Sequence, residues 1–283
     1  MRLATYHAHT TRCDGGDSPS RLAEAALASG MTDLGYSAHA AWPFATEWHL
    51  SPGDYEAYVA EIRELERRFA GKLRIRCGFE ADYLPGVSAP DKGLYARFKI
   101  DYLIGSIHYV GADYPGEIAE PWSVDGPTET VAATLDAAFG GDGKRAVRAY
   151  WSLMRDMVGY CRFDIVGHAD IIRKRNGALG FFDESAPWYR RELETTAKAI
   201  ARAGKIVEIN TGAISRGAMD DLYPSAEFLS ILSKHGARLT VNSDAHAAKD
   251  LTSAYDRAYR AAREAGFTQL WFLDSGGWVP ESL

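Results

Sequence analysis

Two histidines separated by one residue, His7 and His9, end the first apolar run of the chain, and Asp14 follows them. In an extended strand, residues i and i+2 point to one face, so the pair would present two imidazoles side by side. Asp244 and His246 repeat this spacing near the other end of the chain, and we expect each pair to share one strand face. Imidazole and carboxylate groups suit zinc, manganese or iron as ligands.

Partners for these residues recur along the chain. Six of the eight histidines lie at or just past the ends of predicted strands, and three carboxylates lie at equivalent places. The nine candidate ligands are His7, His9, Asp14, His39, Glu80, His108, His168, Asp244 and His246. A lone histidine at a strand end usually has a structural role, but carboxylates crowded at one edge repel one another unless cations compensate them. Nine nitrogen and oxygen ligands exceed the needs of one ion, so we predict two or three divalent ions of zinc, manganese or iron.

The segments that must position these residues alternate between strand-like and helix-like patterns. Strands are expected at residues 3–9, 33–39, 73–83, 102–110, 165–170, 206–210, 239–246 and 269–273. Helices are favoured at residues 18–30, 144–160, 187–204 and 224–235, several of them opened by Ser or Pro and ended by Gly. Repeated strand–helix units indicate a mostly parallel sheet with helices outside. Seven or eight units without a G-x-G-x-x-G motif favour a closed or distorted barrel.

A barrel of this kind places its active site at the carboxyl ends of the strands, where the candidate ligands fall. We see no linker rich in Pro, Gly or Ser, so residues 1–283 are expected to form one domain. An irregular excursion is expected at about residues 111–143, passing over one end of the barrel.

Composition restricts the class of protein. The 283 residues carry a net charge of −6, which argues against a nucleic-acid or membrane-surface binder. No apolar run approaches the roughly 18 residues of a membrane span, and no signal region is evident, so a cytoplasmic protein is expected. Three widely spaced cysteines predict reduced thiols, and Cys13 is interpreted as a buried thiol rather than a ligand. His49 and His235 are poorer ligand candidates; His49 could lie near a substrate or simply pack.

The ordered motifs resemble those of the polymerase and histidinol phosphatase (PHP) superfamily. They read His7-Ala8-His9-Thr10, Ser37-Ala38-His39, Gly78-Phe79-Glu80, Gly105-Ser106-Ile107-His108, Gly167-His168-Ala169-Asp170 and Ser243-Asp244-Ala245-His246. The resemblance covers nearly the whole chain and implies a distorted (β/α)7 TIM-like barrel, the PHP fold, with a trinuclear metal site.

Carried over by position, the resemblance implies three sets of ligands. One ion would take His7, His9, Glu80 and Asp244; a second would take Glu80, His108 and His168; a third would take Asp14, His39 and His246. Glu80 would bridge two ions, and Glu80, Asp244 and His246 are the expected catalytic residues.

Residues 149–174 and the run VEINTGAISRG resemble the histidinol-phosphate phosphatase branch. That branch implies a small phosphorylated substrate, cleaved to histidinol and phosphate in histidine biosynthesis, with Arg173 and Arg216 holding the phosphate. Here Arg216 stands further along its stretch than the branch usually places it. Clustered divalent ions activate a water and neutralise phosphoryl oxygens, and arginine adds bidentate phosphate contacts, so the chemistry agrees.

Three other functions remain open. A metal-dependent amidohydrolase also begins with a His-x-His strand, but it usually has a bridging strand lysine that we do not find. A nuclease-like phosphoesterase is disfavoured by the acidic charge and by the lack of an extended basic groove. A metal-binding module without catalysis would not need nine ligands. The sequence does not identify the oligomeric state.

Overall fold

A seven-stranded parallel sheet carries the candidate ligands. The computed structural model describes residues 2–42, 46–111 and 121–283. Neighbouring strands follow the order β1 (Ala4–Thr5), β2 (Asp33–His39), β3 (Arg74–Asp82), β4 (Tyr102–Ser106), β7 (Ile165–Val166), β8 (Ile206–Asn210) and β9 (Arg238–Asn242). Every pair in this sheet is parallel. The predicted alternation of strands and helices is thereby confirmed.

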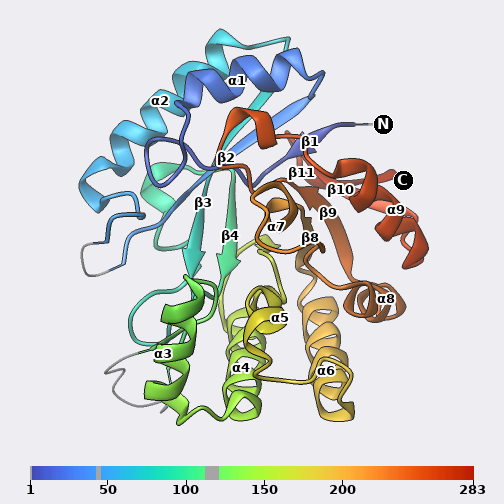
Figure 1. The fold of residues 1–283 in the computed structure, drawn as a ribbon. Coiled ribbons are helices and arrows are strands. Elements are labelled where there is room, and N and C mark those ends of the chain that lie inside the picture. The colour runs from blue at the N-terminus through green and yellow to red at the C-terminus, as the bar shows by residue number, and fades with distance from the viewer. Residues whose placement is uncertain (1, 43–45, 112–120) are drawn as a thin grey trace.

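The sheet curls until its two edge strands approach each other. Beyond the end of β1, Ala8 forms a parallel bridge with Ala245, and the backbone N–H of His9 donates to the carbonyl oxygen of Ala245 at 2.8 Å. The result is the expected distorted, nearly closed seven-stranded β/α barrel (Figure 1).

Helices lie around the outside of the sheet (Figure 1). The longer ones are α1 (Pro19–Ala28), α2 (Tyr55–Arg68), α3 (Thr128–Phe139), α4 (Gly143–Tyr160), α6 (Pro187–Ala203), α8 (Ala226–Lys234) and α9 (Tyr255–Glu264). Short turns of helix are η1 (Pro52–Asp54), η2 (Ala96–Phe98), η3 (Ile171–Arg173), α5 (Asn176–Leu179), α7 (Gly212–Ser215) and η4 (Ala248–Asp250). The N-cap predicted for the first helix is confirmed, because the Ser18 hydroxyl accepts from the Arg21 N–H. In the described ranges, no helix is both long enough and apolar enough to cross a bilayer.

Several strands are shorter than predicted. The expected strand 239–246 ends at Asn242, so Asp244 and His246 follow it in a loop, and Asp244 has a positive φ of 48°. The prediction that these two side chains share one strand face was therefore wrong. After Asn242 the chain pairs with a neighbouring strand only at Ala245, so the alternating spacing overestimates the length of the strand.

The excursion at residues 111–143 was predicted as irregular, and the structure corrects this. It contains α3 and β6 (Trp122–Ser123), which pairs antiparallel with β5 (Tyr109–Val110). Val131, Leu135 and Phe139 recur every four residues and are buried, the pattern of a helix packed on one face. Residues 112–120 of this predicted excursion lie outside the described residues.

The predicted strand at 269–273 forms, but it does not join the barrel. As β10 (Gln269–Asp274) it pairs antiparallel with β11 (Gly277–Ser282). Arg2 connects this hairpin to the barrel: it forms an ion pair with Asp33 at 2.6 Å and donates to the carbonyl oxygen of Leu273.

The barrel interior is filled by large side chains at the end opposite the ligands. Tyr102 is fully buried, and its hydroxyl donates to the Tyr36 carbonyl oxygen. A Cβ at Gly78 would lie 2.6 Å from the Tyr102 ring, so glycine is needed there for the ring to fit. This packing supports the strands that end at the candidate ligands.

Candidate metal centre

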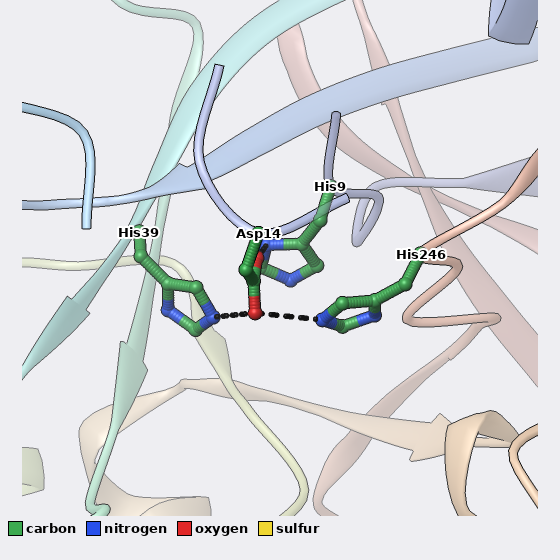
Figure 2. Close-up of side chains that lie close together, drawn as sticks. All are labelled: His9, Asp14, His39 and His246. Atoms are coloured by element: carbon green, nitrogen blue, oxygen red, sulfur yellow. Dashed lines mark hydrogen bonds and ion pairs between the residues drawn. The ribbon is translucent and has the colours of Figure 1, made fainter. Parts of the chain in front are cut away.

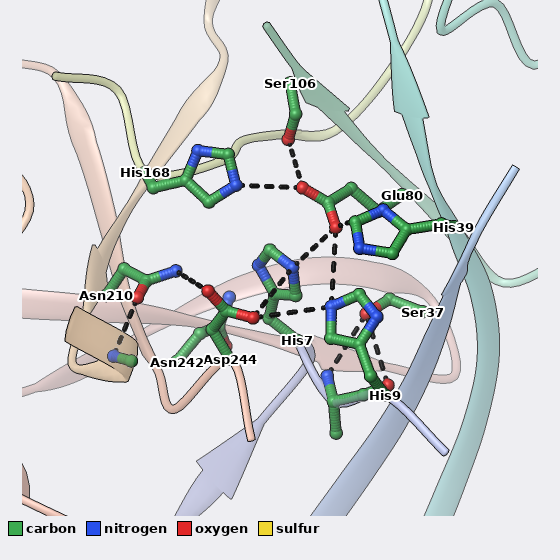
Figure 3. A network of polar contacts seen from close by, with 12 residues as sticks. His7, His9, Ser37, His39, Glu80, Ser106, His168, Asn210, Asn242 and Asp244 are labelled. Carbon is green, nitrogen blue, oxygen red and sulfur yellow. Dashed lines mark hydrogen bonds and ion pairs between the residues drawn. The ribbon is translucent and has the colours of Figure 1, made fainter. Parts of the chain in front are cut away.

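Glu80, near the carboxyl end of β3, lies at the centre of a histidine cluster (Figure 3). Its Oε2 lies 3.0 Å from His7 Nε2 and 3.4 Å from His9 Nε2. Its Oε1 lies 2.9 Å from His168 Nε2 and 3.8 Å from His108 Nε2. The two carboxylate oxygens thus face two different pairs of histidines, and Oε2 also lies 3.1 Å from His39 Nδ1, so Glu80 is placed as a bridging ligand would be.

Asp244 faces the first of these pairs. Its Oδ1 lies 3.4 Å from His9 Nε2 and 3.6 Å from His7 Nε2. Its Oδ2 accepts from Asn210 and from Arg216. One oxygen is thus held by neutral and cationic donors while the other points into the cluster.

A further group surrounds Asp14 (Figure 2). Its Oδ2 lies 3.1 Å from His246 Nε2 and 3.6 Å from His39 Nε2, while its Oδ1 lies 3.4 Å from His9 Nδ1. His9 lies between the two groups, with its ring stacked on those of His39 and His246 at 4.3 Å each. A Cβ at Gly15 would meet the Thr10 backbone at 2.4 Å, so glycine lets the loop bring Asp14 close.

The nine predicted residues therefore come together. Ligand atoms within 4.8 Å of one another form the groups His9–Asp14–His39–His246, His7–His168–Asp244, His7–His9–Glu80 and Glu80–His108–His168. Two differences from the sets implied by resemblance are that His9 also belongs to the group around Asp14, and that Asp244 groups with His7 and His168.

Two further carboxylates orient the ligand histidines from behind. Glu208, on β8, lies 3.0 Å from His7 Nδ1, and Asp82, on β3, lies 2.7 Å from His108 Nδ1. A carboxylate that accepts from one ring nitrogen fixes the tautomer and leaves the other nitrogen free to bind a metal ion.

The residues fit metal ions on independent grounds. Burial lowers the pKa of His39 to about 3, so its ring is neutral and can donate a lone pair at physiological pH. Burial would raise the pKa of Glu80, but the surrounding histidines, His7 foremost, outweigh that effect and hold the pKa well below its usual range. His9 Nε2, His39 Nδ1 and His168 Nδ1 are buried ring nitrogens without a hydrogen-bond partner. Such atoms are costly unless a cation or water satisfies them.

The cluster opens into a cavity of about 360 Å³. Glu80, Asp244 and His246 line it, whereas His7 and His9 are fully buried beneath it. Arg216 also lines the cavity, and its Nη2 donates to Asp244 Oδ2 at 3.0 Å.

Arg173, which was predicted to hold the phosphate, lies elsewhere. Arg173 does not line this cavity; it forms ion pairs with Glu184 and Asp221, both at 2.6 Å. Lys174, the next residue, does line it. The turn η3 ends at Arg173, so adjacent side chains leave it in different directions.

The two remaining histidines and the three cysteines do not belong to the nine candidate ligands. His235 pairs with Glu194 on the outer helices at 2.8 Å, away from the cluster. His49 is buried between the Trp42 and Trp48 rings and does not line the cavity. The three cysteines are free, and burial raises the pKa of the Cys13 thiol to about 12. Cys13 Sγ lies 3.6 Å from His9 Nδ1.

Sequence reasoning missed several residues. Glu208 and Asp82 support ligands, and Ser106 donates to Glu80 Oε1 at 2.6 Å. Glu208 gave a usable signal, because a glutamate inside the apolar strand IVEIN must be paired when buried. Asp82 stands two residues after Glu80 and so shares its strand face.

The nearly closed barrel and the cluster of histidines and carboxylates are features of a metal-binding β/α-barrel protein. A comparison with known families leads to the same class. The model of the PHP domain family matches residues 5–212, about three quarters of the chain. The chain belongs to the PHP domain family.

Several proteins that are similar to this chain are named as histidinol phosphatases. A probable histidinol-phosphatase of Deinococcus radiodurans is 28% identical over 93% of this chain and 94% of its own length. The histidinol-phosphatase of Bacillus subtilis is 23% identical over 90% of this chain and 98% of its own. The crystal structure of histidinol phosphate phosphatase from Lactococcus lactis, in complex with zinc, L-histidinol and phosphate, is 21% identical. It aligns over 98% of this chain and 99% of its own, with a TM-score of 0.74, so the two share their fold.

Proposed function

We propose that this protein is a metal-dependent phosphomonoester hydrolase that converts histidinol phosphate to histidinol and phosphate. The observation that carries the proposal is Glu80, whose two oxygens face separate groups of histidines in the wall of a cavity that cationic side chains also line. The names of the relatives support this substrate.

Two or three divalent ions of zinc, manganese or iron would be held by the nine ligand-type residues. His7, His9, Glu80 and Asp244 would hold one ion, Glu80, His108 and His168 a second, and Asp14, His39 and His246 a third. His9 lies close enough to Asp14 to serve either neighbouring site. Bound at these residues, the ions would activate a water and neutralise charge on the phosphoryl oxygens.

The chain's own residues would orient the reaction. Glu80, Asp244 and His246 are assigned catalytic roles on the resemblance, and their lining of the cavity, which other candidate ligands share, is compatible with that assignment. Arg216 supplies a permanent positive charge that suits a phosphate dianion. Arg173 is paired with Glu184 and Asp221, and these contacts favour a structural ion pair over a phosphate contact.

Two measurements test the proposal. Elemental analysis of the purified protein is expected to find more than one transition-metal ion per chain. Histidinol phosphate, an aryl phosphate and a panel of amides and lactones should then be assayed with the metal-loaded protein. Release of inorganic phosphate from histidinol phosphate is expected. Hydrolysis of an amide or lactone without any phosphomonoesterase activity would instead identify an amidohydrolase.

A further inference from the structure

Two oppositely charged side chains face each other in the wall of the cavity. Lys174 Nζ lies 3.0 Å from Asp125 Oδ2, and both residues line the cavity. They come from different segments: Lys174 follows η3, and Asp125 lies between β6 and α3. Their side chains are 12% and 24% exposed, so the pair is largely removed from bulk water yet opens on the site.

Both groups carry the charge that a ligand could use. Burial alone would raise the pKa of Asp125, but Lys174 and His108 outweigh it and hold this pKa at about 2. Asp125 is therefore an anion at neutral pH, and it lines the same cavity as His108.

The fold does not need this pair to hold the two segments together. The next residue, Arg175, already donates through Nε to the carbonyl oxygen of Gly126 at 2.8 Å. Arg173, one residue earlier, is held by Glu184 and Asp221. An ion pair that the fold does not require and that opens on the cavity can be exchanged for contacts to a ligand, provided that each charge gains a new partner.

We propose that Lys174 and Asp125 separate to bind a 2-aminoalkyl phosphate, with Lys174 contacting the phosphate and Asp125 the ammonium group. This inference rests on the proposed function and names the residues that select its substrate class. Histidinol phosphate has this chemistry, because its ammonium group is on the carbon next to the one that carries the phosphate ester. Inserting it replaces one ion pair by two, so neither charge is left alone in the cavity.

Asp125 would distinguish substrates only by whether they carry an amino group. A phosphate monoester without an amine would engage Lys174 but leave Asp125 without its cation. The structure thus predicts discrimination between two substrates that differ only in the amino group.

The test compares histidinol phosphate with its deamino analogue, 3-(imidazol-4-yl)propyl phosphate, using the metal-loaded protein. Asp125→Asn is expected to lower kcat/KM for histidinol phosphate by about 10- to 100-fold, the effect of losing one charged hydrogen bond. The same variant should change kcat/KM for the analogue by less than about threefold. Lys174→Gln should lower kcat/KM for both substrates.

Asp136→Asn provides a matched control, since it removes the same charge from an exposed position on α3. It should leave both substrates unaffected. If Asp125→Asn lowers both activities equally, or neither, at unchanged metal content, the inference is overturned while the phosphatase function stands. If the wild-type protein hydrolyses neither phosphate, the proposed function itself fails.

Discussion

Glu80 lies within ion-pair distance of five of the candidate histidines. It is 2% exposed, and imidazoles surround both of its oxygens. A buried carboxylate in such a position is stable only because positive charge, from protonated rings or from metal ions, compensates it. Its charge is thus the property that a substitution should target.

Glu80→Gln keeps the size of the side chain but removes this charge. We expect phosphatase activity to fall by about a hundredfold or more, the scale seen when one electrostatic stabiliser is lost. Metal content should fall by at least one ion per chain, while circular dichroism shows a retained fold. Near-normal turnover in this variant would show that Glu80 does not bridge two ions.

Arg216 and Arg173 allow a comparison between two arginines near the same cavity. Arg216→Ala should lower kcat/KM for histidinol phosphate by about 10- to 100-fold, with metal content unchanged. Arg173→Ala should mainly lower stability, because it removes the cation that pairs with Glu184, with Asp221 and with the buried Asp170. An equal loss of kcat/KM in both variants would restore Arg173 as a phosphate contact.

At the scale of the elements, sequence patterns identify the strands but not where they end. The candidate ligands on β2 and β3 lie in the predicted strands, because both strands run through to them. Asp244 and His246 were singled out as candidate ligands for a partly wrong reason, since a loop positions them rather than a strand face. Their position depends on the Ala8–Ala245 bridge, which forms only when the barrel closes.

The basic run after β7 shows a second limit of sequence patterns. Arg173, Lys174 and Arg175 are adjacent, and nothing in their order indicates which one faces the cavity. The choice depends on carboxylates brought in from residues 125, 184 and 221. Such contacts between distant segments require the fold to be known.

Glu208 shows how one strand supports a ligand on another. It accepts from His7, from the backbone N–H of His168 and from the Asn242 amide. Glu208→Gln replaces an acceptor by a donor beside a histidine that already donates. Metal affinity is expected to fall by about 10- to 100-fold, measured by zinc titration against a competing chelator.

Glu194→Gln is the matched control for Glu208→Gln. It makes the same substitution beside a histidine, His235, outside the site. Its metal affinity should equal that of the wild type. A similar zinc affinity in both variants would mean that Glu208 does not tune the ligand.

At the scale of the whole molecule, Asp33 joins the two ends of the chain to the barrel. It is fully buried and forms ion pairs with Arg2 and Arg74. Burial alone would raise the pKa of Asp33, but hydrogen bonds from the two arginines lower it. A carboxyl whose folded pKa is depressed stabilises the protein above its unfolded pKa of about 3.9, and this contribution is lost as the pH falls through the folded value.

Asp33→Asn should therefore destabilise the protein by about 3 kcal/mol at pH 7, measured by urea unfolding, because two cations lose their buried partner. The difference from the wild type should shrink as the pH falls below about 4. Asp136→Asn, at an exposed position, should show no such difference. A difference between Asp33→Asn and the wild type that does not change with pH would argue against this role for the charge.

Metal binding should stabilise the whole barrel, because candidate ligands follow the strands on both sides of its closure. His7 and Asp244 belong to opposite edges of the sheet, and Glu80 lies between them in strand order.

A ligand present at 100 times its Kd contributes about 2.7 kcal/mol, which for a chain of this size is roughly 5–10 °C in Tm. Treatment with a chelator should therefore lower the Tm of the wild type by about this amount, and added zinc should restore it. Glu80→Gln, expected to hold fewer ions, should lose less. If elemental analysis shows that the chelator removed the metal and yet the Tm is unchanged, the ions do not link the two edges of the sheet.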